Sequence, residues 1–161
     1  MIIKALIDED FLNYKEPVMY IGTAYCDGKC CKEAGIPLSV CQNDAWRMTN
    51  TIEMSDSEII ERYLSNDITN AICFAGLEPF EQFEDICGLI SKLRTEYYCD
   101  DTVVIYTGYN KDEIRSQIDT LATFKNIVVK FGRYIPNHKK HYDPVIGVYL
   151  ASDNQYAEAV S

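Results

Sequence analysis

Short apolar runs recur along the whole chain and are separated by segments with a helical pattern. The runs cover residues 2–7, 18–24, 70–75, 102–107, 126–131 and 145–150. Most of them show no strict alternation of polar and apolar residues, which is typical of strands covered on both faces and therefore of a largely parallel sheet. Parallel strands need long crossover connections, usually helices. The pattern predicts an α/β fold of about six strands.

The expected helices lie between these runs. Ser55 and Glu58 have the spacing of a capping box and predict a helix start. A second helix is indicated between Phe83 and Tyr97 by one apolar stripe at helical spacing, and a third is indicated from Ile114 onward. Strands and helices thus alternate along the chain, as right-handed crossovers require.

The length and composition fit one globular domain. The chain has 161 residues, of which 47% are hydrophobic, so residues 1–161 are expected to form a single domain with its own core. No stretch resembles a signal peptide or is long and apolar enough to span a bilayer, so we expect a cytoplasmic protein without a membrane partner. The formal net charge of −10 argues against direct nucleic-acid binding, which needs a basic surface.

Four of the seven cysteines are grouped early in the chain, at Cys26, Cys30, Cys31 and Cys41. In a reducing compartment such a group indicates metal binding rather than disulfides. Thiolates suit iron–sulfur clusters and zinc alike, and spacing alone does not distinguish a cluster from a structural zinc site that uses all four thiols. Cys30 and Cys31 are adjacent, so their side chains diverge and one of them is expected to face the metal.

Unusual residues also follow the other expected strands. Glu78 lies in a Gly–Leu–Glu–Pro turn after the run at 70–75, and Thr107–Gly108 closes the run at 102–107. Ser152 and Asn154 follow the last run. Because ligands of open α/β sheets bind at the carboxyl ends of the strands, these groups and the thiols predict one site at one edge of the sheet. Arg133 follows the fifth run and is expected to be solvated, with contact to a carboxylate or a partner as the alternative.

Several motifs, taken in order, resemble the radical S-adenosylmethionine (SAM) enzymes, and among them the activating proteins of anaerobic ribonucleotide reductase. Cys26 and Cys30 match the start of the Cys-x3-Cys-x2-Cys motif, and Cys41 with Asn43 and Trp46 resembles its third cysteine and the residues that follow. Residues 76–79 resemble the turn that holds the amino group of SAM. Residues 103–109, 132–134 and 152–155 are similar to the later strand signatures. Relative to this pattern, residues 32–40 include an insertion.

The resemblance implies a fold and a set of ligands. The fold would be a small, incomplete parallel (β/α) barrel of the radical SAM type. Cys26, Cys30 and Cys41 would hold a 4Fe–4S cluster with one open iron, with Cys31 as the alternative to Cys30. The implied cofactor-binding residues are Asn43, Gly76, Glu78, Pro79, Thr107, Gly108, Ser152 and Asn154.

The resemblance also implies an activity. The cluster would cleave SAM reductively to a 5′-deoxyadenosyl radical, with no catalytic side chain beyond the cluster. This radical would generate a glycyl radical on a partner such as anaerobic ribonucleotide reductase, with flavodoxin or ferredoxin as electron donor. Two alternatives stay open at this point: a radical SAM enzyme that acts on a small molecule, and a non-catalytic module that binds zinc or an iron–sulfur cluster.

Overall fold

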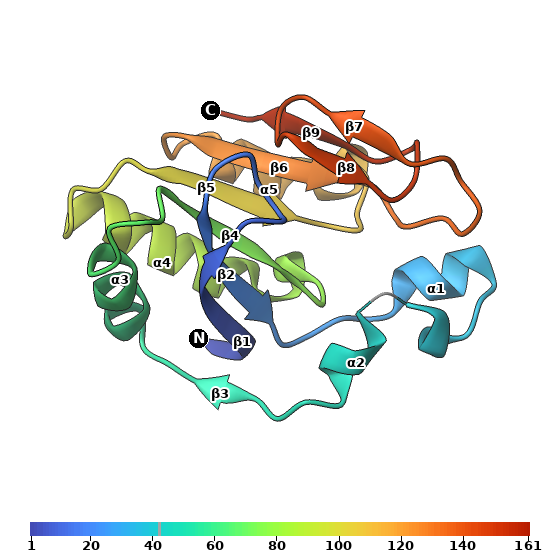
Figure 1. Cartoon of the computed structure of the whole chain (residues 1–161), viewed down its shortest axis with the longest axis horizontal. Coiled ribbons are helices and arrows are strands. Elements are labelled where there is room, and N and C mark those ends of the chain that lie inside the picture. Colours follow the sequence, from blue (N-terminus) through green and yellow to red (C-terminus); the bar gives the residue numbers. More distant parts are fainter. Residues whose placement is uncertain (42) are drawn as a thin grey trace.

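A seven-stranded sheet forms the centre of the protein in a computed structural model that describes residues 1–41 and 43–161 (Figure 1). Its strand order is β3-β1-β2-β4-β5-β6-β9. The strands are β1 (Ile2–Asp10), β2 (Val18–Thr23), β3 (Ile52–Glu53), β4 (Ala71–Gly76), β5 (Thr102–Tyr106), β6 (Ile127–Phe131) and β9 (Tyr156–Ala159). A separate two-stranded sheet contains β7 (His141–Asp143) and β8 (Val148–Leu150).

The predicted α/β class is confirmed, and its parallel part consists of four neighbouring strands. β2, β4, β5 and β6 pair in parallel with one another in that order. Every residue of β2, β4 and β6 is buried, as the lack of alternation in these runs predicted. Their carboxyl ends therefore meet along one edge of the sheet.

The expected orientation of the outer strands was wrong. β1 runs antiparallel to β2, because the residues between the two strands are too few for a helical crossover. The run at 145–150 does not enter the central sheet: Gly147, with φ of +73°, turns the chain, and Val148–Leu150 pairs with β7 instead. The place beside β6 is taken by β9, which is antiparallel and was not predicted.

Three helices cover one face of the central sheet. The helical segments are α1 (Lys29–Ala34), α2 (Asp44–Arg47), α3 (Asp56–Leu64), α4 (Phe83–Thr95) and α5 (Arg115–Leu121), with 3-10 turns η1 (Leu38–Val40), η2 (Pro79–Gln82) and η3 (Lys111–Ile114). The buried residues of α3, α4 and α5 pack with Ile72 and Phe74 of β4 in one core. These are the three helices that the sequence predicted. Figure 1 shows α1 and α2 apart from them, on a segment that extends beyond the sheet.

Small side chains on the opposite face of β4 make room for a cavity. Ala71, Cys73 and Ala75 alternate with Ile72 and Phe74 and point away from the helices, into a second and smaller core. That core is closed by the β7–β8 hairpin through Ile146 and Leu150. Within the described part of the chain, no helix has both the length and the apolar character needed to cross a membrane.

The capping box at the start of α3 gives a test of the fold. The Glu58 N–H donates to Ser55 Oγ at 3.3 Å, and the Ser55 N–H donates to Glu58 Oε2 at 2.8 Å. Ser55→Ala removes one of these bonds, and we expect it to lower the free energy of unfolding by about 1 kcal/mol in urea titrations. Ser116→Ala is the matched control, because Ser116 is exposed and its hydroxyl donates to the neighbouring Gln117 side chain. Equal losses in both variants would contradict the assignment.

Candidate functional site

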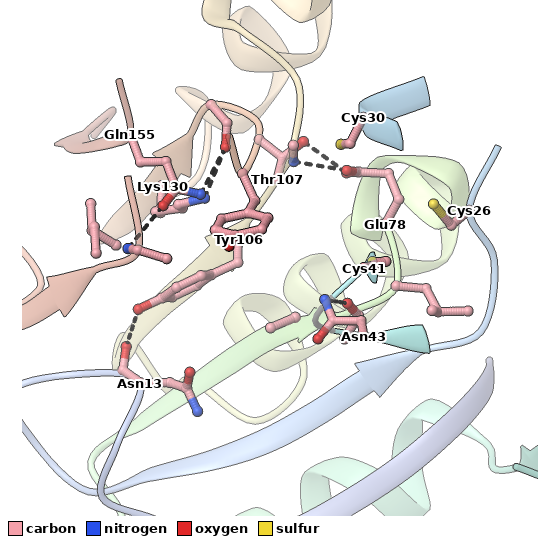
Figure 2. A pocket seen from close by; sticks show the side chains of 18 of the residues that line it. Asn13, Cys26, Cys30, Cys41, Asn43, Glu78, Tyr106, Thr107, Lys130 and Gln155 are labelled. Atoms are coloured by element: carbon pink, nitrogen blue, oxygen red, sulfur yellow. Dashed lines mark hydrogen bonds between the residues drawn. The ribbon is translucent and has the colours of Figure 1, made fainter. Parts of the chain in front are cut away.

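A cavity of about 300 Å³ lies at the carboxyl ends of the parallel strands. Nine residues that the sequence assigned to the site line it: Cys26, Cys30, Cys31, Cys41, Asn43, Gly76, Glu78, Thr107 and Gly108. They come from the segment after β2, the turn after β4 and the turn after β5. In the view of Figure 2, the thiols of Cys26, Cys30 and Cys41 lie around Glu78. The sheet topology thus brings together groups that are far apart in the sequence.

Gly76 sets the path of the chain into the site. It has φ of +92°, and a Cβ at this position would lie 3.0 Å from Gly22 Cα on the neighbouring strand. Only glycine fits such a close approach in this conformation. The carbonyl oxygen of Gly76 accepts a hydrogen bond from the Asn43 side chain, which connects the turn to the residues after Cys41. Two residues later, the Glu78 N–H donates to the Tyr25 carbonyl at 2.8 Å.

The carboxylate of Glu78 is buried, with 5% of the residue exposed. Its Oε1 accepts from the Thr107 hydroxyl at 2.7 Å and from the Phe80 N–H at 3.1 Å, and its Oε2 accepts from the Gly108 N–H at 2.9 Å. Burial raises the pKa of Glu78 to about 7, while these hydrogen bonds act in the opposite direction. Because a carboxylate offers about four acceptor positions, one position on Oε2 stays available for a ligand.

The four thiols are distributed around the cavity wall. Cys30 Sγ lies 2.5 Å from where a Cβ on Gly108 would be, so a side chain at position 108 would displace it. Cys26 Sγ accepts from Arg47 Nη2 and from the Gly28 N–H, both at 3.3 Å. Cys31 is buried beside Cys41. Cys30 and Cys31 both line the cavity, Cys30 next to Gly108 and Cys31 beside Cys41.

The donor set of thiols lining one cavity fits an iron–sulfur cluster. Among the described residues, no three His, Cys, Asp or Glu side chains converge as they would on one ion. In a 4Fe–4S cluster each cysteine binds a different iron, so thiols placed around a cavity suit it. Burial raises the pKa of Cys26 and Cys31, and that of Cys30 to about 11. Metal binding would therefore release protons.

Lys130 is a cavity residue that the sequence analysis missed. It lies in β6, is only 6% exposed, and donates from Nζ to the Gly132 carbonyl at 3.0 Å. Burial lowers its pKa to about 8. An ammonium group has three donors, so two remain for a ligand. The sequence offered one signal for this residue, because Lys130 is the single charged residue in the apolar run 126–131. A lysine is almost never fully buried without a partner, so such a position indicates a ligand or a polar contact.

Three of the predicted cofactor-binding residues lie outside the cavity lining. Pro79 begins η2, and the Ser152 hydroxyl and the Asn154 side chain both donate to the Arg133 carbonyl, at 3.4 Å and 2.8 Å. Their neighbour Gln155 lines the cavity instead and donates to the Gly132 carbonyl at 3.1 Å. Figure 2 shows Gln155 beside Lys130.

The expectation of a solvated Arg133 was wrong. Arg133 is 8% exposed, and its guanidinium forms two hydrogen bonds to Glu113, at 2.5 Å and 2.7 Å. These bonds hold the pKa of Glu113 well below its usual range. Glu113 lies in η3, and α5 and β6 separate it from Arg133 in the sequence. No local sequence pattern could therefore have revealed the ion pair between Arg133 and Glu113.

Comparison with known proteins identifies a family for this chain. A family model described as "4Fe-4S single cluster domain" matches residues 23–155, which include every candidate ligand and cofactor-binding residue. No curated protein and no solved structure shows a significant match. The match supports the iron–sulfur interpretation of the thiols over the zinc alternative.

The pKa of Glu78 gives a test of this site. In the cluster-free protein we expect the Glu78 carboxyl to titrate near pH 7 in ¹³C NMR spectra. Because the folded state holds this proton more tightly than the unfolded chain, ionisation of Glu78 lowers the stability of the fold as pH rises from about 4.3 toward 7. Thr107→Val removes a donor to the carboxylate and should raise this pKa further. Titration in the range of a free glutamate would show that the carboxyl is solvated.

Proposed function

The chain belongs to the family of 4Fe–4S single cluster domains, and on this premise we propose that it is a radical SAM activating enzyme. The proposed cluster ligands are Cys26, Cys30 and Cys41, with Cys31 as the alternative to Cys30. Cys30 is preferred because its thiol borders Gly108, whose N–H is bonded to Glu78. Three thiolates on four irons leave one iron open for a cofactor. The open sheet would be a reduced form of the radical SAM barrel.

The observation that carries the proposal is a pair of buried, opposite charges beside the thiols. Glu78 follows β4 and Lys130 lies in β6. Thr107, which directly follows the intervening strand β5, lies between them (Figure 2). Glu78 keeps one free acceptor position and Lys130 keeps two donors. The α-amino acid part of SAM carries one ammonium and one carboxylate, which match these groups. Buried groups of both signs would recognise it far more strongly than exposed ones.

The residues of the chain would bind and orient the cofactor, while the cluster provides the redox chemistry. When bound and reduced, a 4Fe–4S cluster supplies the electron that breaks the sulfonium bond of SAM and yields a 5′-deoxyadenosyl radical. The cavity wall would exclude water from that radical. Glu78 and Lys130 would fix the amino acid end of the cofactor, and Asn43, Gly76, Thr107 and Gly108 would shape its surroundings.

The resemblance in sequence supports a protein substrate. We propose that a glycyl radical enzyme of the anaerobic ribonucleotide reductase kind receives the radical on a glycine. Flavodoxin or ferredoxin would donate the electron, in the cytoplasm. The net charge of −10 would favour a partner with a basic patch.

Cofactor cleavage tests the proposed function. The protein is reconstituted anaerobically with iron and sulfide, reduced, and given SAM, and we expect 5′-deoxyadenosine and methionine by chromatography. Alanine at Cys26, Cys30 or Cys41 should abolish both cluster and product, while Cys31→Ala and the remote control Cys87→Ala should keep them. A protein that holds one zinc and never cleaves SAM is instead a non-catalytic module. Equal cluster loss in the Cys30 and Cys31 variants would contradict the choice of Cys30.

Lys130 provides a second test that addresses cofactor binding. Lys130→Met keeps the length of the side chain but removes the charge, so we expect KM for SAM to rise about ten- to a hundredfold, as for a lost charged hydrogen bond. Iron and sulfide content should stay unchanged. Lys125→Met removes a charge from an exposed side chain and is the matched control. An unchanged KM in the Lys130 variant would remove this residue from the proposed site.

A further inference from the structure

The segment that carries the cysteines has little apolar packing of its own. α1 buries only Cys31, and η1 and α2 bury no residue. α1 has six residues and no side-chain cap at its N-terminus. A helix this short is not stable by itself, and contacts with the rest of the protein must hold it.

Four charged residues connect α1 to the loops at the ends of β5 and β6. We call Lys29, Glu33, Glu113 and Arg133 the α1 clasp. Arg133 contacts Glu33 through Nε at 2.6 Å and Nη2 at 3.1 Å, in addition to its two bonds to Glu113. Lys29 Nζ lies 2.5 Å from Glu113 Oε1. Each member of the clasp therefore has a partner of opposite charge across the gap between α1 and the sheet.

The arrangement of the clasp differs from that of ordinary surface ion pairs. Arg133 is buried, and its planar guanidinium engages two carboxylates from different elements, a geometry that lysine does not reproduce. The Tyr109 ring lies beneath both cations, with Lys29 Nζ at 5.3 Å and the Arg133 guanidinium at 5.9 Å from its centre. Lys29 and Glu33 are one turn apart on α1, and Cys30 lies between them in the sequence. The clasp therefore fixes the turn of helix that presents the Cys30 thiol.

We propose that Arg133 is a positioning residue that, through Glu113 and Glu33, holds α1 and its Cys30 thiol against the site. The polar clasp takes the place of the apolar contacts that α1 lacks. Opening of the clasp would let α1 move away from Gly108 and Glu78 without any change in the core. The importance of this positioning for catalysis rests on the proposed function, but the docking of α1 itself does not.

Hydrogen exchange measured by mass spectrometry on the full-length, cluster-free protein tests the proposal. Arg133→Gln should speed the exchange of α1 amides at least about tenfold, the effect of one lost charged hydrogen bond, while α3 amides stay unchanged. Arg133→Lys keeps the charge and should restore part of the protection. Arg62→Gln removes the exposed ion pair with Asp8 and should leave α1 unchanged. In the wild-type protein, molar salt should speed exchange in α1 more than in α3.

Two results would overturn the proposal: unchanged α1 exchange in a folded Arg133→Gln protein, or equal increases in α1 and α3. If Arg133→Gln does not fold, Glu33→Gln breaks one arm of the clasp at a half-exposed residue and should produce a smaller increase confined to α1. After reconstitution, the reduced cluster of Arg133→Gln should give a broader EPR signal than the wild type, and Arg133→Lys should narrow it. The hydrogen-exchange test uses the cluster-free protein, so its result does not depend on whether the wild type cleaves SAM. The proposal for Arg133 and the proposed function can therefore fail separately.

Discussion

The buried residue Glu78 connects the chain segments that form the site. Its side chain accepts hydrogen bonds from Thr107 and Gly108 at the end of β5, and its backbone N–H bonds the Tyr25 carbonyl next to Cys26. A single residue after β4 thus connects a neighbouring strand to the cysteine segment. An ionised carboxylate in such a place is unfavourable unless hydrogen bonds and a cation offset the loss of water. Phe80 provides a further donor and Lys130 a nearby charge.

The site lies on one face of the sheet because the two faces of β4 carry side chains of different size. The large side chains of β4, Ile72 and Phe74, face the helices, whereas Ala75 faces the cavity. The parallel arrangement then brings the turns after β4 and β5 to the same edge. The cysteine segment, which cannot build a core of its own, is held at that edge by Asn43, Arg47 and the α1 clasp. These polar contacts, together with the packing of the Trp46 ring against Tyr20, therefore position the thiols.

Much of this arrangement could be predicted from the sequence, because it depends on local patterns. The buried runs of β2, β4, β5 and β6, the cap of α3 at Ser55 and the grouping of thiols with strand-end residues are all visible in short stretches. The antiparallel direction of β1 was not predicted, since an apolar run does not reveal its direction. β9 was missed because only one of its four residues, Ala157, is buried. The pairing of Arg133 with Glu113 was also hidden, because it depends on the packing of two loops. Lys130 was detectable in principle, as a lone charge in an apolar run.

We propose that the cluster has an open iron at which SAM binds beside Glu78. The most direct test is the EPR spectrum of the reduced, reconstituted protein with and without SAM. We expect a 4Fe–4S signal that changes when SAM is added. We also expect that Glu78→Ala keeps the signal but loses most of the change. A 4Fe–4S signal that is the same with and without SAM in the wild-type protein would contradict the claim.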